Sequence, residues 1–166
     1  DDSGVSYGDA LRVAQKKGYA EADPTNDVAG YDAARKLAIL ASIGFHANVT
    51  FDDVLVEGIE KISQNDVQYA SEMGYTIKLL AVAIRQENGI ALNVYPAFVP
   101  RSHPLASVKG SYNAIYVTGN IVDDVMFYGK GAGSLPTASA VMGDVISTAK
   151  HILNHSTGTG MMLTET

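Results

Sequence analysis

The sequence predicts an α+β fold, a mixed and largely antiparallel sheet with helices packed on one of its faces. Strand-like segments come in two hairpin pairs, 75–85 with 90–99 around Asn88-Gly89, and 113–119 with 122–128 around Gly119-Asn120. Ile90, Leu92 and Val94 alternate with Ala91, Asn93 and Tyr95, as in a half-buried strand. Pro96 and Pro100 place the end of this strand at an edge or a bend, because proline cannot donate to a ladder.

Four segments with helical signals flank these strand pairs, three before the first pair and one after the second. They are 7–17, ended by Gly18; about 30–46; about 64–73, ended by Gly74; and a last helix from near Pro136 to about Leu153. Residues 37–45 carry no charge on any face, which predicts a buried helix. Residues 51–59 allow either a helix start at Asp52-Asp53 or a short strand at 54–56.

Composition limits the classes of protein to consider. The chain has 166 residues, 46% hydrophobic and 18% charged, which fits one core-forming domain; we assign it to residues 1–154 and expect 155–166 to be a linker or disordered tail. With 12 basic against 18 acidic residues and no basic cluster, we expect no nucleic-acid partner. Zero cysteines exclude disulfides and are compatible with a cytoplasmic protein. We expect no metal site, because the 4 histidines are scattered, and no membrane segment, because no run of about 20 apolar residues occurs.

Charged residues concentrate in the segment 18–36, at a predicted junction between a loop and a helix. Four acids and no base lie between positions 21 and 34: Glu21, Asp23, Asp27 and Asp32. Such a loop creates a negative potential suited to an ammonium group. Asp32 and Lys36 have the spacing and order of a helical ion pair. This pair is either a solvated surface pair or a functional one, since perturbed ionisable groups concentrate at such junctions.

A second candidate site is the glycine-rich run Gly129-Lys130-Gly131-Ala132-Gly133-Ser134, which leads into the last predicted helix. Bare backbone N–H groups at a helix start can hold an anion, and small residues allow a ligand to approach closely. The alternative is a tight turn between a strand and a helix. For Lys130 we favour a solvated side chain over a phosphate contact.

The acidic junction resembles the signature of homoserine dehydrogenases. The matching positions are Ala14, Gly18, Tyr19, Ala20, Asp23, Pro24, Asp27, Val28, Gly30, Asp32 and Lys36. Further resemblance occurs at 74–80, in His103-Pro104-Leu105-Ala106 with Lys109-Gly110 and Asn113, and from Tyr128 to Val141. The resemblance therefore covers roughly residues 7–153.

The resemblance implies reversible hydride transfer between NADP or NAD and a four-carbon amino acid, interconverting aspartate semialdehyde and homoserine in threonine, methionine and isoleucine biosynthesis. It implies that Lys36 handles the proton on the C4 oxygen and that Asp32 orients it. The implied substrate-binding residues are Glu21 and Asp27 for the substrate ammonium and Tyr19 at the pocket rim. The implied cofactor-binding residues, near the nicotinamide, are Gly131, Ala132 and Gly133.

The resemblance also implies a homodimer and a missing part. Members of the family carry a nucleotide-binding domain ahead of this region, and the chain has no strand followed by G-x-G-x-x-G. We therefore interpret the chain as a fragment that holds the substrate and dimerisation region and is inactive alone. Two alternatives stay open: a non-catalytic dimerisation module, or a dehydrogenase of another semialdehyde. The absence of cysteine disfavours the second, because phosphorylating semialdehyde dehydrogenases need a thiol nucleophile.

Overall fold

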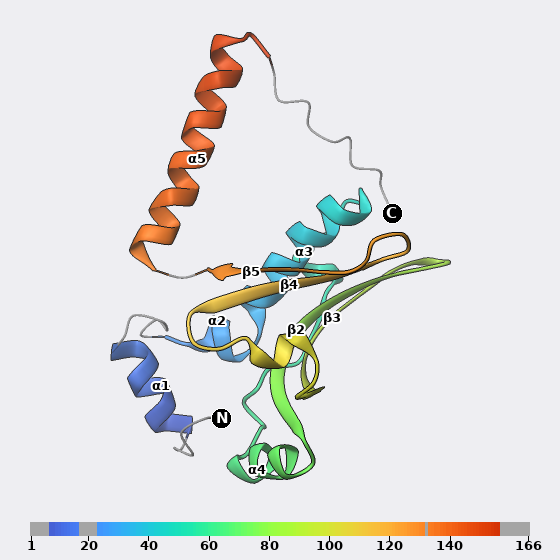
Figure 1. Ribbon diagram of the computed structural model, residues 1–166, viewed down its shortest axis with the longest axis vertical. Coiled ribbons are helices and arrows are strands. Elements are labelled where there is room, and N and C mark those ends of the chain that lie inside the picture. Colours follow the sequence, from blue (N-terminus) through green and yellow to red (C-terminus); the bar gives the residue numbers. More distant parts are fainter. Residues whose placement is uncertain (1–6, 17–22, 132, 157–166) are drawn as a thin grey trace. The chain divides into compact units, whose positions relative to one another are not determined.

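The computed structural model describes residues 7–16, 23–131 and 133–156, and its fold is α+β, as the sequence predicts (Figure 1). Its described residues form two compact units, one up to Arg101 and one from Ser102 onward. Within the described ranges, no helix is both long enough and apolar enough to span a membrane.

The first unit is built around a three-stranded mixed sheet. Its elements are α1 (Tyr7–Lys16), α2 (Thr25–Val28), α3 (Tyr31–Phe45), the 3₁₀ helix η1 (Phe51–Asp53), β1 (Leu55–Val56), α4 (Gln64–Glu72), β2 (Tyr75–Gln86) and β3 (Gly89–Pro100). The strand order is β1-β3-β2, with β1 parallel to β3 and β2 antiparallel to it. The segment 51–59 thus contains both of the structures that its sequence allowed, a short helix followed by a strand.

The β2–β3 hairpin is confirmed, with its turn one residue earlier than predicted. Gln86 pairs with Gly89, so Glu87 and Asn88 form the connection. Gly89 has φ 149°, in the region that favours glycine, whereas Asn88 does not have a positive φ. Pro96 lies on β3 beyond the two positions paired with β1, so its missing N–H leaves no ladder partner unsatisfied on that side.

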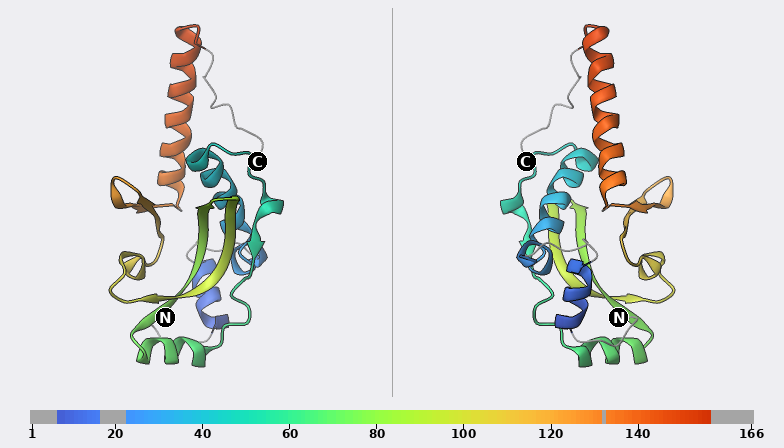
Figure 2. Two further views of the ribbon diagram at one scale, coloured as in Figure 1. Left: turned by 90° about the vertical axis from the view of Figure 1, so that its right-hand side faces the viewer. Right: turned by 90° about the vertical axis from the view of Figure 1, so that its left-hand side faces the viewer.

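The core of this unit lies between α3 and one face of the sheet, as the two views of Figure 2 show. An alanine-rich stripe on α3 lets the helix approach the strands closely, and β3 contributes alternate residues from its inner face. The buried members of this cluster are Ala34, Leu37, Ala38, Ala41, Val54, Leu92 and Val94. Val94 is 1% exposed and is the largest fully buried side chain among the described residues.

The prediction that α3 is buried on all sides is wrong for one of its faces. Ile39 and Ile43 are 62% and 56% exposed, and Leu40 is exposed as well. The physical reason is that the sheet covers only the alanine stripe of the helix. The apolar sequence of 37–45 therefore predicts a helix that packs against the core, but it does not predict how many faces of that helix the rest of the first unit covers.

The second unit combines a two-stranded antiparallel sheet with a long helix. Its elements are the 3₁₀ helix η2 (Pro104–Ser107), β4 (Tyr112–Gly119), β5 (Asp123–Lys130) and α5 (Ser134–Leu153). The turn between the strands spans 120–122, and Asp123 follows it with φ 54°. Helix α5 begins two residues before the predicted Pro136, because a proline in the first turn removes no helical hydrogen bond.

Candidate functional site

Asp32 and Lys36 form the ion pair that their spacing predicts, near the start of α3. Lys36 Nζ lies 2.7 Å from Asp32 Oδ2. The Lys36 side chain is 64% exposed and that of Asp32 46%, so both groups keep much of their hydration in this chain. Asp32 lies in the first helical turn, where the helix dipole favours a carboxylate. The pair is thus formed and oriented, but it is not desolvated.

A left-handed glycine fixes where α3 starts relative to the sheet. Gly30, with φ 83°, is the N-cap of α3, and a Cβ added there would lie 3.0 Å from Val94 Cγ1. Its N–H donates to the Asp27 carbonyl at 3.3 Å, which links the end of α2 to the start of α3. Asp27 and Asp32 therefore flank a turn that is anchored directly to the most buried residue of β3.

The segment after β1 also contacts this turn, at the end of α2. The Ile59 N–H donates to the Val28 carbonyl at 2.9 Å. A Cβ added at Gly58 would lie 2.5 Å from that same carbonyl oxygen, so only glycine lets the segment approach α2 this closely. The short helix carrying Asp27 is thus fixed by contacts on both of its sides.

Three residues of the acidic junction remain, Tyr19, Glu21 and Asp23. Tyr19 and Glu21 lie outside the described residues. Asp23 accepts hydrogen bonds from Thr25 Oγ1 at 2.5 Å and Thr25 N at 3.1 Å, and these bonds lower the pKa of the Asp23 carboxyl. Asp23 therefore forms the turn before α2.

The glycine-rich segment forms the connection between β5 and α5 in the second unit. Gly133 has φ 121°, a conformation that favours glycine, and its carbonyl accepts from Thr137 N at 3.1 Å as α5 begins. Gly131 donates to the Ser111 carbonyl at 3.4 Å. Ala132 lies outside the described residues. The bare backbone of Gly131 and Gly133 beside a helix start leaves room for a ligand to approach closely.

Next to this connection, the base of the β4–β5 hairpin carries an aromatic stack. Tyr112 and Tyr128 are parallel within 5°, with ring centroids 4.8 Å apart, and Lys130 Nζ lies 5.9 Å from the Tyr112 centroid. Lys130 therefore has a cation–π partner in addition to solvent. The strand register places these residues together, since Tyr112 pairs with Lys130.

His103 has a structural role at the start of η2. Its Nδ1 accepts from Leu105 N at 3.2 Å, and its ring lies 4.8 Å from that of Tyr116. Tyr116 hydrogen-bonds Asp124, which raises the pKa of the tyrosine and, together with a hydrogen bond from Thr118, lowers the pKa of the carboxyl. In the part of the chain that the structure describes, no group of three or more His, Asp or Glu side chains could hold a metal ion.

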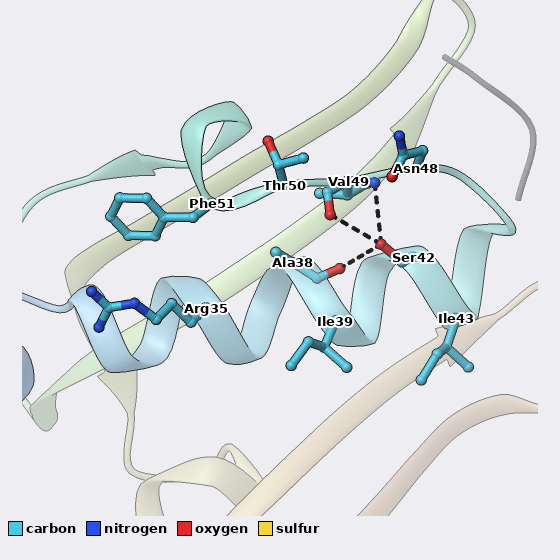
Figure 3. Close-up of a pocket in the computed structure, with 9 residues that line it drawn as sticks. All are labelled: Arg35, Ala38, Ile39, Ser42, Ile43, Asn48, Val49, Thr50 and Phe51. Carbon is cyan, nitrogen blue, oxygen red and sulfur yellow. Dashed lines mark hydrogen bonds between the residues drawn. The ribbon is translucent and has the colours of Figure 1, made fainter.

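An open groove of about 470 Å³ lies between α3 and the segment 48–51 (Figure 3). Arg35 stacks over the Phe51 ring at 5.2 Å at one end, and Ile39 and Ile43 line the helix side. In the middle, the Ser42 hydroxyl donates to the Ala38 carbonyl at 2.8 Å and accepts from the Val49 N–H at 3.1 Å. Asp32 and Lys36 do not line this groove, so it is distinct from the ion pair.

Comparisons with known proteins agree with the motif. The family model described as "Homoserine dehydrogenase" matches residues 1–146. The homoserine dehydrogenase of Corynebacterium glutamicum is 53% identical over 156 residues, and that of Bacillus subtilis is 47% identical over 152. The chain belongs to the homoserine dehydrogenase family. The match covers 91% of this chain but 35% of the Corynebacterium protein, so the chain spans about a third of the length of that relative.

Solved structures of homoserine dehydrogenases share the fold. The enzyme from Thiobacillus denitrificans superposes with a TM-score of 0.87 at 46% identity, covering 92% of this chain and 36% of that one. A structure of the S. aureus enzyme gives a TM-score of 0.83 at 42% identity, covering 94% and 38%. The region matched by the family model includes both candidate groups, the anchored turn with Lys36 and the glycine connection before α5.

For this homoserine dehydrogenase family member, sequence reasoning missed the residues that support the site. Gly58 was not singled out, and its role depends on a contact with α2 that no local pattern indicates. Asn113 was noted only as part of the family resemblance, although its amide lies against Gly131. The signal that could have pointed to Asn113 is its register opposite Gly129, which follows once the two strands are paired.

Proposed function

We propose that this chain is the substrate-binding part of a homoserine dehydrogenase that interconverts L-homoserine and L-aspartate 4-semialdehyde with NADP or NAD. The observation that carries the proposal is the Asp32–Lys36 pair, 2.7 Å apart at the start of an anchored helix and inside the family-matched region. The reaction would serve threonine, methionine and isoleucine biosynthesis in the cytoplasm. The chain acts as part of a homodimer and is inactive without a nucleotide-binding domain.

Lys36 is the group that we assign to the proton of the C4 oxygen. The nicotinamide cofactor supplies or accepts the hydride at C4. A lysine ammonium is charged near neutral pH, so it can donate a proton to the semialdehyde oxygen as that oxygen becomes an alcohol. In the opposite direction the amine must accept the proton, which requires burial or a second cation to lower its pKa. Asp32 holds the ammonium in place through the 2.7 Å contact.

The other assigned residues bind the two ends of the reaction complex. Glu21 and Asp27 bind the substrate ammonium, and Tyr19 lies at the rim of the pocket. The fixed position of Asp27, in a short helix held on two sides, supports this assignment. Gly131, Ala132 and Gly133 contact the cofactor near its nicotinamide end, which the bare backbone before α5 supports.

The proposal is tested in a hybrid enzyme, in which this chain replaces the matching region of the Corynebacterium glutamicum relative. We expect the hybrid to turn over homoserine and this chain alone to show no turnover. In the hybrid, Lys36→Ala should lower kcat by about 10²–10⁴-fold, the usual contribution of a general acid–base group. Lys36→Arg should not restore activity, because a guanidinium does not release its proton. The matched control is Lys150→Ala, which removes an exposed lysine near the end of α5.

These measurements also separate the proposal from its alternative. A loss below tenfold in Lys36→Ala would remove Lys36 from the chemistry. If the hybrid folds and dimerises but has no activity with either cofactor, the chain is a dimerisation module and not a catalytic part.

A further inference from the structure

Gly131 lies against the amide of Asn113, so a larger residue at this position would force the Asn113 side chain to move. A Cβ added at Gly131 would lie 2.7 Å from Asn113 Cγ and closer still to Nδ2, inside the contact limit for real atoms. The backbone of Gly131 does not itself require glycine, since its φ is not in the left-handed region. Gly133, with φ 121°, is different, because its conformation alone favours glycine.

Asn113 also extends the β4–β5 ladder by one step. The last paired residues are Tyr112 and Lys130, so Gly131 is the first residue after the ladder. Its N–H and Asn113 Nδ2 both donate to the Ser111 carbonyl, each at 3.4 Å. The Ser111 carbonyl thus accepts from both the Gly131 N–H and the Asn113 amide. The Asn113 amide also occupies the space that a side chain at position 131 would need.

We propose that Asn113 is a positioning residue for cofactor binding, whose amide fixes the course of the backbone at Gly131. This inference rests on the proposed function, in which Gly131 and its neighbours contact the nicotinamide end of the cofactor. Hydride transfer demands reacting atoms about 3–3.5 Å apart, and a displacement of about 1 Å can cost about 10²-fold in rate. A contacting backbone must therefore be held as firmly as a catalytic side chain, and Asn113 is the side chain that touches it.

A double-mutant cycle in the hybrid enzyme tests this inference. The variants are Gly131→Ala, Asn113→Ala and both together, with the affinity for the reduced nicotinamide cofactor measured by fluorescence titration without substrate. Gly131→Ala should weaken cofactor binding about tenfold or more, because the new Cβ displaces the Asn113 amide from the Ser111 carbonyl that Gly131 also contacts. In the double variant the nearest remaining atom is the Cβ of position 113, at 3.4 Å, an ordinary contact. The double variant should therefore bind better than the product of the single effects predicts.

Two further variants separate positioning from general stability. Asn113→Asp keeps the size of the side chain but cannot donate to Ser111, so it should weaken cofactor binding and should not relieve Gly131→Ala. Gly143→Ala, on α5 with open space around it, should leave the affinity within about twofold. KM for homoserine should stay within about twofold in all variants, because none of the changed residues is assigned to the substrate.

The outcomes distinguish this inference from the proposed function. If the unsubstituted hybrid does not bind the cofactor, the proposed function fails and the inference fails with it. Multiplicative effects in the double variant overturn the inference alone, as does a lower unfolding temperature with unchanged cofactor affinity in the Asn113 and Gly131 variants.

Discussion

Gly30→Ala tests whether the start of α3 is held by contact with the core as well as by its own backbone conformation. Gly30 has φ 83°, and alanine in the left-handed region costs about 1–2 kcal/mol. About 0.4–1 kcal/mol of this is offset because alanine reduces the entropy of the unfolded chain. The new Cβ would also lie 3.0 Å from Val94 Cγ1 and 3.2 Å from Val56 Cγ1, and overpacking of a core costs about 1–3 kcal/mol. We therefore expect the free energy of unfolding to fall by about 1–5 kcal/mol.

Gly74→Ala is the matched control for the backbone part of this cost. Gly74 has the same φ of 83°, but a Cβ added there meets no atom within 4 Å. Both glycines belong to the first unit, so both variants report on the unfolding of the same part of the chain. Urea unfolding followed by far-ultraviolet circular dichroism measures both, and the difference between them isolates the packing term. Adding Val94→Ala to Gly30→Ala should give a loss smaller than the sum of the single losses. Equal losses in Gly30→Ala and Gly74→Ala would refute the claim that the turn is anchored to β3.

Three further predictions concern the substrate, the assembly and the pH dependence of stability. Glu21→Gln in the hybrid enzyme should raise KM for homoserine much more than KM for the cofactor, whereas equal changes would indicate a structural loop. Sedimentation of the hybrid should show a dimer, because the sheet face opposite α3 presents apolar residues such as Ile84, which is 53% exposed. A monomer at tens of micromolar would contradict this prediction. Asp66 accepts from Ser63 Oγ at 2.6 Å and Ser63 N at 2.8 Å, and these bonds lower its pKa in the folded state. The stabilising contribution of Asp66 is therefore present above the ordinary aspartate pKa of about 3.9 and is lost as the pH falls through the lowered value. Asp66→Asn should therefore make the free energy of unfolding depend less on pH in the acid range. An unchanged pH dependence would contradict this.

Local signals predicted the secondary structure because the physics that sets it is local. The two hairpins follow from turn residues between alternating strands, and α4 ends before Gly74 because that residue adopts a positive φ. The Asp32–Lys36 contact was predictable for the same reason, since one turn of helix separates the two residues.

Contacts between distant segments could not be predicted in this way. The exposure of Ile39 and Ile43 depends on how many faces of α3 are covered, which periodicity does not report. The close approach of Gly58 to the Val28 carbonyl joins segments 30 residues apart in the sequence, and glycine there resembles any loop glycine. The sequence predicts which groups react, and the structure adds the contacts around Asp27, Asp32 and Lys36.

The geometry separates two properties of Lys36 that a motif treats as one. Its position is set by the anchored turn and by the 2.7 Å contact with Asp32, both of which exist in this chain. The strength of its attraction to Asp32 depends on solvation, and with 64% of the Lys36 side chain exposed, water screens the two charges. Asp32→Asn should therefore change the stability of the chain by less than about 1 kcal/mol, as for surface ion pairs. It should nevertheless lower kcat in the hybrid enzyme, because the proposed function has bound substrate and cofactor exclude water from Lys36. A large loss of stability with unchanged kcat would mean that the pair supports the fold and takes no part in the reaction.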